Sequence, residues 1–123
     1  MPVRIRTKTR LQGSVTPAAL NQETDVINLG NQTDDYIIEG QISLQNMGSG
    51  DVVVIKTYIA VDGTNQKQAD QITLTDAQTI PVVRIPSCTV AYNGKFRVTI
   101  TQTAGATLKE FPYSFIIQIM EVI

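Results

Sequence analysis

The stretch from Tyr36 to Leu44, YIIEGQISL, decides the fold class, because apolar and polar residues alternate along it. The alternation puts four apolar side chains on one face and three polar ones on the other: Tyr36, Ile38, Ile42 and Leu44 against Glu39, Gln41 and Ser43. A period of two is typical of a β-strand with one buried face. We therefore expect an antiparallel sheet that packs on one side only.

The same period continues on both sides of this stretch. It recurs at 72–74, 88–92 and 96–101, whereas the segments 51–61 and 113–122 are apolar on both faces. The latter two are predicted to be central strands. The run VVRI at 82–85 lies between Pro81 and Pro86 and is expected at a sheet edge, because proline cannot donate to a β-ladder.

Turn residues separate these segments. Asn93-Gly94 predicts a hairpin between the strands on either side, since both residues tolerate positive φ. Further loops are expected at 46–51, at 62–70 and at 103–107, and no helix is expected beyond one turn within 16–23. The chain is thus predicted to be all-β, an antiparallel, jelly-roll-like β-sandwich of about eight to nine strands. An extended basic arm, 1–22, would precede the sandwich domain, 23–123.

The charge distribution separates this arm from the rest of the chain. Residues 1–22 carry Arg4, Arg6, Lys8 and Arg10 and no acid, whereas the remaining residues carry six cations and eleven acids. Because the cations alternate with Val3, Ile5 and two threonines, a fully extended arm would put all of them on one side.

Three interpretations of the arm follow. It is an amphipathic edge strand whose charges prevent aggregation, a strand that docks on the sheet of a neighbouring copy, or a contact for nucleic acid. We favour docking, and we do not expect nucleic acid as a partner, because four cations make few phosphate contacts and the acidic body repels them. The expected assembly residues are Val3, Arg4, Ile5, Arg6, Lys8, Arg10 and Leu11.

The composition excludes several kinds of chemistry. The chain has no histidine and one cysteine, so histidine-dependent nucleophiles and the usual zinc and copper sites have no basis. No phosphate-binding glycine motif occurs. A pair of carboxylates, from Glu39, Glu110 and Glu121, is the only enzymatic route left, and nothing in their spacing favours it. We expect no enzyme activity, no catalytic residue, no cofactor and no metal.

Other features favour an ordinary soluble domain. The opening residues lack the apolar region of a signal peptide, and no apolar run approaches the length of a membrane span, so neither export nor membrane insertion is expected. Asp62-Gly63 is interpreted as a turn rather than a calcium loop. Cys88 is expected to be buried beside Val90 and Tyr92.

This arrangement resembles the small β-sandwich and jelly-roll proteins of virus particles, namely capsid, capsid-decoration and turret-type subunits. The resemblance rests on the basic segment MPVRIRTKTRLQGSV followed by a compact meander of strands that ends on FPYSFIIQIMEVI. It implies a homo-oligomer with exchanged arms, in which the loops 46–51 and 62–70 face outward or contact neighbours. A length of 123 residues is short for a main shell protein and favours an accessory role.

Our first hypothesis is therefore a non-enzymatic structural protein of the virion, capsid-associated or decorating. It would self-assemble through the arm and its sheet surfaces and also contact other virion proteins. A filament or pilus subunit is a variant of this hypothesis. The alternative is a stand-alone module that binds carbohydrate or protein through loop residues such as Tyr58, Asn65 and Tyr92.

Overall fold

A computed structural model of the chain describes residues 2–123, and Met1, the first residue of the expected arm, lies outside the described residues. The described chain contains eight strands and no helix. The strands are β1 (Val3–Val15), β2 (Thr24–Asn28), β3 (Tyr36–Ser43), β4 (Val52–Ile59), β5 (Lys67–Thr75), β6 (Val82–Val90), β7 (Arg97–Ala104) and β8 (Phe111–Val122).

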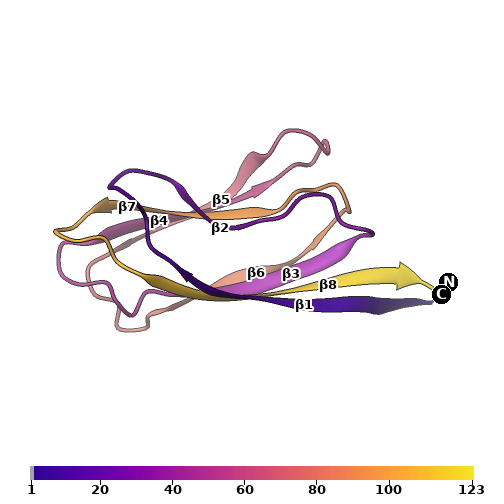
Figure 1. Cartoon of the computed structure of the whole chain (residues 1–123), viewed down its shortest axis with the longest axis horizontal. Coiled ribbons are helices and arrows are strands. Elements are labelled where there is room, and N and C mark those ends of the chain that lie inside the picture. Colours follow the sequence, from indigo (N-terminus) through magenta and orange to yellow (C-terminus); the bar gives the residue numbers. More distant parts are fainter. Residues whose placement is uncertain (1) are drawn as a thin grey trace.

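The strands form two four-stranded antiparallel sheets that face each other as two layers (Figure 1). One sheet has the order β1-β8-β3-β6 and the other β2-β7-β4-β5. The first strand pairs with the last, the second with the seventh, the third with the sixth and the fourth with the fifth. Such nested pairing, divided between two sheets, is a jelly roll. The predicted fold class is confirmed.

The core lies between the two layers and is built from the alternating faces that the sequence shows. Tyr36, Ile38, Ile42 and Leu44 are all buried, whereas Glu39 and Gln41 are exposed. Val98 and Ile100 of the facing sheet, and Phe96 just before β7, are equally buried. Burial of this apolar surface is the main free-energy term that holds the layers together.

One contact joins the two layers, and another fixes the packing within the first sheet. The Tyr36 hydroxyl of the first sheet accepts a hydrogen bond, over 3.3 Å, from the backbone N–H of Phe96, which directly precedes β7 of the second sheet. Within the first sheet, the Phe115 ring lies directly on Gly40, where a Cβ atom would overlap it. A residue other than glycine at position 40 would therefore displace Phe115 from the core.

The expected hairpin at Asn93-Gly94 is wrong. β6 and β7 lie in different sheets, so the turn between them carries the chain across the sandwich. Lys95, rather than Asn93 or Gly94, takes positive φ there, and Gly94 is needed because a Cβ atom would overlap Val90. The expected meander is wrong for the same reason: β4 and β5 are the one consecutive pair of described strands that are hydrogen-bonded neighbours.

The predicted central and edge strands are confirmed. β4 and β8 each have a strand on both sides, and β6 is an edge strand. The runs at 82–85 and 88–92, expected as separate segments, join in β6 through a register shift beside Pro86. This shift lets the strand continue past a residue that has no N–H group.

The N-terminal segment is extended, and residues 3–15 form β1, which pairs along its whole length with β8 of the same chain. This is the edge-strand arrangement, and it makes β1 a member of the first sheet. The expected boundary at residue 22 falls in the connection between β1 and β2. Whether 1–22 also acts as an assembly arm stays a prediction.

Candidate assembly surfaces

The outer edge of β1 is the longest free sheet edge in the described chain. β1 has 13 residues, nearly all exposed, and its only β-partner is β8. Half of its backbone N–H and C=O groups therefore point away from the sheet without a strand to bind them. Such an edge can receive a strand from another molecule.

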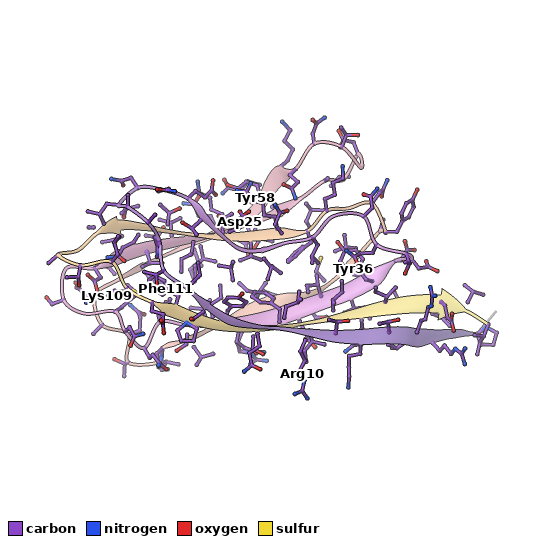
Figure 2. All side chains as sticks on the ribbon, viewed as in Figure 1. Arg10, Asp25, Tyr36, Tyr58, Lys109 and Phe111 are labelled. Carbon is purple, nitrogen blue, oxygen red and sulfur yellow. The ribbon has the colours of Figure 1, made fainter. Side chains whose placement is uncertain are left out.

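The cations of β1 do not all lie on one side, contrary to the expectation. A register shift between Ile5 and Thr7 leaves Arg4 opposite Glu121 and Lys8 opposite Gln118. Glu121 and Gln118 are three residues apart on one strand, so they face opposite sides of the sheet. Lys8 shares its side with Arg10, which points away from the second sheet (Figure 2).

The cations also differ in their partners. Arg4 Nε lies 2.6 Å from Glu121 Oε1, and Arg6 Nε lies 3.9 Å from Glu121 Oε2. Among the described residues, no acidic group lies within ion-pair distance of Lys8 or Arg10. Leu11, also expected as an assembly residue, is half-buried against the core and anchors β1.

The ends of β1 and β8 form a two-stranded ribbon that projects beyond the sandwich, with both termini at its end (Figure 1). We call residues 3–5 and 120–123 the tip. Its apolar side chains are largely exposed: Val3 59%, Ile5 43%, Val122 54% and Ile123 56%. Exposed apolar residues gathered in one place are typical of an interaction surface.

A second apolar feature lies on the opposite side of the sandwich, between the edges of β5 and β6. Three hollows of about 130, 210 and 290 Å³ follow one another there, and neighbouring hollows share lining residues. We call them together the seam groove. Its apolar lining comes from β4, β5, β6 and the segments that follow β4 and β6: Ile55, Ile59, Val61, Ile72, Val83, Ile85, Cys88, Val90 and Phe96.

One carboxylate lies in the seam groove. Asp70 lines two of the three hollows, and its register partner Thr57 lines the same two. Asp70 Oδ1 accepts a hydrogen bond from the neighbouring Gln71 N–H, and no cation lies within ion-pair distance of Asp70 among residues 2–123. A charge turned inward on an edge strand keeps that edge from pairing at random.

The outer face of the second sheet carries a polar cluster, which we call the Glu23 cluster. Glu23 Oε2 accepts hydrogen bonds from the Tyr58 hydroxyl at 2.5 Å and from Thr99 Oγ1 at 2.6 Å. Arg97 Nε donates to Asp25 Oδ1 at 2.6 Å, and its guanidinium carbon lies 5.0 Å from the centre of the Tyr58 ring. These contacts attach the short strand β2 to β7 and β4.

Ionisation in this cluster follows from the same contacts. Burial opposes the charge of Glu23, but hydrogen bonds from Thr99 and Tyr58 and the charge of Arg97 outweigh it, so the pKa of Glu23 is lowered. The hydrogen bond to Glu23 raises the pKa of Tyr58, and burial adds to the effect. The cluster therefore stabilises the fold and leaves no activated group.

The three glutamates considered for catalysis do not face one another. Glu110 precedes β8 and Glu121 lies near its far end, about 35 Å away at the usual rise of a strand. Glu39 lies opposite Ile116, midway between them. A pair of carboxylates flanking one bond requires a separation below about 10 Å. The carboxylate hypothesis is therefore wrong for these residues.

The three residues considered for ligand binding have different structural surroundings and do not form one site. Tyr58 lies in β4, where Glu23 and Arg97 hold it, and is not a loop residue. Asn65 closes its own turn through hydrogen bonds to Asp62, which also lower the pKa of Asp62 to about 2. Asp62 is thus a turn residue, as predicted. Tyr92 is half exposed, which corrects its expected inward position.

Cys88, expected to be buried, is half-buried and lines the seam groove. Within residues 2–123 no group of three or more acidic or cysteine side chains is placed to hold a metal ion. No helix in the same range is long and apolar enough to span a membrane.

With this geometry in place, the chain can be compared with known proteins. No family model matches it, and no curated protein is similar in sequence. The fold, however, recurs in solved structures. One is from Bacillus endospore appendages, which form disulfide-linked pili; it is 19% identical with a TM-score of 0.54, and the match covers 92% of this chain and 87% of that one.

Another similar structure is that of infectious bursal disease virus, Gx strain. It is 14% identical with a TM-score of 0.50, and the match covers 97% of this chain. This chain spans about a third of the length of that viral chain, since the match covers 33% of it. The resemblance in architecture to virus-particle jelly rolls is thus confirmed for the fold.

Sequence reasoning found the cations of β1 and missed the seam groove. The groove arises where two edge strands of different sheets fail to close, and sequence alone does not show which strands become those edges. One signal was present. Asp70 shares the alternation of Ile72 and Leu74, so it interrupts an otherwise apolar face.

Proposed function

We propose that this chain is a non-enzymatic structural subunit that assembles with copies of itself, as a capsid-associated or decorating protein of a virus particle. The observation that carries the proposal is the 13-residue free edge of β1, which ends in an exposed apolar tip. A long unprotected edge promotes pairing with other chains.

The charges of β1 agree with this role. Lys8 and Arg10 are exposed on one face of the strand, where no acid of the described chain pairs with them, while the rest of the chain has a net charge of −5. A positive strip and a negative body attract each other between copies. Contacts through β1 would therefore weaken at high salt.

A filament or pilus subunit is the second candidate, favoured by a specific observation. The likeness to the endospore appendage structure extends over nearly the whole of both chains, whereas the viral chain is about three times longer than its matched part. Those pili are disulfide-linked. This chain has one cysteine, which can join two copies but not a series, so a filament of this sequence would be held without covalent links.

Solution mass tests the proposal first. Light scattering on the full chain, at low and high salt, is expected to show an oligomer that becomes smaller as salt rises. Replacing Lys8 and Arg10 by Gln should reduce the mass, and Lys95→Gln is the control of like charge outside β1. A monomer at every salt and protein concentration would contradict the proposal.

Electron microscopy of the assembled material then separates the two candidates. Closed particles, or decoration of a shell, would support the virion role, and open fibres would support the filament. Deletion of residues 1–22 is a poor test, because it removes β1 and leaves β8 without one of its two partners.

A further inference from the structure

Two apolar surfaces of this molecule lie on opposite sides of it, and neither has a partner within the described chain. The tip extends the edge of the first sheet at β1, and the seam groove opens beside β6, at the other edge of the same sheet. Because the two surfaces are different, a contact between them joins copies head to tail.

We propose that the tip of one copy seats in the seam groove of the next. This inference rests on the proposed function, since it specifies which surfaces of the self-assembling subunit meet. Val3, Ile5 and Val122 would pack against the isoleucines of β4, β5 and β6, and Lys8 would pair with Asp70.

The chemistry of the two surfaces is matched. The register places Val3 and Ile5 opposite Val122 and Met120, so these four side chains share one face of the ribbon. Lys8 lies opposite Gln118, two residues from Met120, and therefore follows them on that face. The ribbon face is apolar at the tip and carries Lys8, then Arg10, farther along, while the groove is mainly apolar, with Asp70 lining two of its hollows and Arg84 lining one.

The charges explain why this groove would select this ribbon. Among residues 2–123, no cation lies within ion-pair distance of Asp70, although Arg84 lines the same hollow, and no acid lies within that distance of Lys8. Placing an apolar segment beside Asp70 removes water from the carboxylate, which is costly unless a cation comes with it. Arg4 and Arg6 are less suited, because Glu121 already pairs with both.

β6 supports docking of a ribbon in the groove over simple addition of a strand to its edge. Pro86 has no N–H group, and the register shift beside it bends the ladder, so β6 is a poor template for a new strand. Side-chain packing in the groove does not depend on that ladder.

Cys88 provides a probe, since it lies in the groove and is the only cysteine of the chain. In assembled protein, seating of the tip should slow the reaction of Cys88 with a maleimide by about tenfold or more relative to diluted, dissociated protein. Equal rates in the two states, with assembly confirmed by light scattering, would overturn the inference while leaving the proposed function intact.

A charge exchange tests the pairing directly. Lys8→Asp and Asp70→Lys should each raise the concentration needed for assembly by about tenfold, and the two together should restore it. Arg10→Asp combined with Asp70→Lys is the control, and it should not restore assembly. No rescue by the first pair would contradict the Lys8–Asp70 contact.

The apolar part of the contact is tested separately. Ile5→Asp lies at an exposed position, so the variant should fold, which circular dichroism checks. We expect it to lose assembly and to keep Cys88 fully reactive. If Ile5→Asp assembles as the parent does, the tip is not the segment that occupies the groove. A parent chain that never assembles would instead refute the proposed function as well.

Discussion

The two ends of this sandwich differ in their polar and apolar groups: polar groups are hydrogen-bonded within the molecule at one end, and apolar side chains are exposed at the other. At one end, buried Gln102 donates to the Ala104 and Thr107 carbonyls and accepts from the Lys109 N–H, so the loop before β8 is held within the molecule. At the other end, the tip exposes apolar side chains. The difference indicates that the Gln102 end contributes to the stability of the fold, whereas the tip is a surface available to a partner.

The largest expected effect lies at the closed end. Gln102→Ala would remove a buried side chain and leave two carbonyls and one N–H group, all partly buried, without their partners. We expect the free energy of unfolding to fall by about 2–4 kcal/mol in urea denaturation. Gln12→Ala on exposed β1 is the control, with a change below about 0.5 kcal/mol. Equal losses in the free energy of unfolding for Gln102→Ala and Gln12→Ala would show that the hydrogen bonds of Gln102 do not stabilise this end.

Asp51 gives the next largest effect at the same end. It is buried, accepts a hydrogen bond from the Gly48 N–H at 2.8 Å, and lies 3.9 Å from Lys109 Nζ. Asp51→Ala should cost about 1–3 kcal/mol in the same assay. Glu39→Ala, at an exposed carboxylate, would serve for comparison. A loss of stability for Asp51→Ala no larger than for Glu39→Ala would count against a role for Asp51 in closing this end.

The Glu23 cluster, between the two ends, predicts a dependence on pH. A lowered pKa means that Glu23 stabilises the fold above its usual pKa of 4.5 and that this contribution is lost as pH falls through the folded value. Glu23→Gln should cost about 0.5–1 kcal/mol at pH 7, because solvent screens the cluster. The difference from the parent should shrink as pH falls through the folded pKa of Glu23, which lies below 4.5.

Tyr58 gives the opposite sign in the same cluster. Its raised pKa means that the stabilisation is present below pH 10 and is lost as pH rises through the folded value. Unfolding curves from pH 3 to pH 11 would check the loss of stability at low pH, through Glu23, and at high pH, through Tyr58.

Glu39→Gln, on the exposed face of the first sheet, is the matched control for Glu23→Gln. A similar pH profile for the two variants would contradict the assignment of the low-pH effect to Glu23.

The smallest effect on stability is expected at the tip. Val3→Ser combined with Val122→Ser should change the free energy of unfolding by less than about 0.5 kcal/mol, since both side chains are already exposed. The same pair should reduce the mass of the assembled protein in light scattering. A loss of stability as large as that of Gln102→Ala would show that the tip belongs to the folding unit and is not a surface kept for assembly.

Much of the fold was predictable because it depends on local alternation. The stretch 36–44, the central strands 51–61 and 113–122 and the edge position of 82–85 follow from which side chains alternate and where proline stands. The hairpin at Asn93-Gly94 was wrong, because a turn signal tells where the chain reverses and not whether the next strand stays in the same sheet.

The candidate site was predictable only in part. Val3, Arg4, Ile5, Arg6, Lys8 and Arg10 were found as a charged and apolar segment, but the face that each occupies depends on a register shift that sequence does not show. The seam groove could not be found at all, since its lining comes from three strands and two sheets.

The sequence by itself determined that this chain is all-β, that its N-terminal segment is basic and that it contains no histidine. Those properties depend on residue type and on a period of two. Only the tertiary structure decided that β1 pairs with β8, that Lys8 and Arg4 face opposite sides, and that the seam between β5 and β6 stays open. The reason is physical: pairing between distant strands depends on how the whole core packs, which no local pattern records.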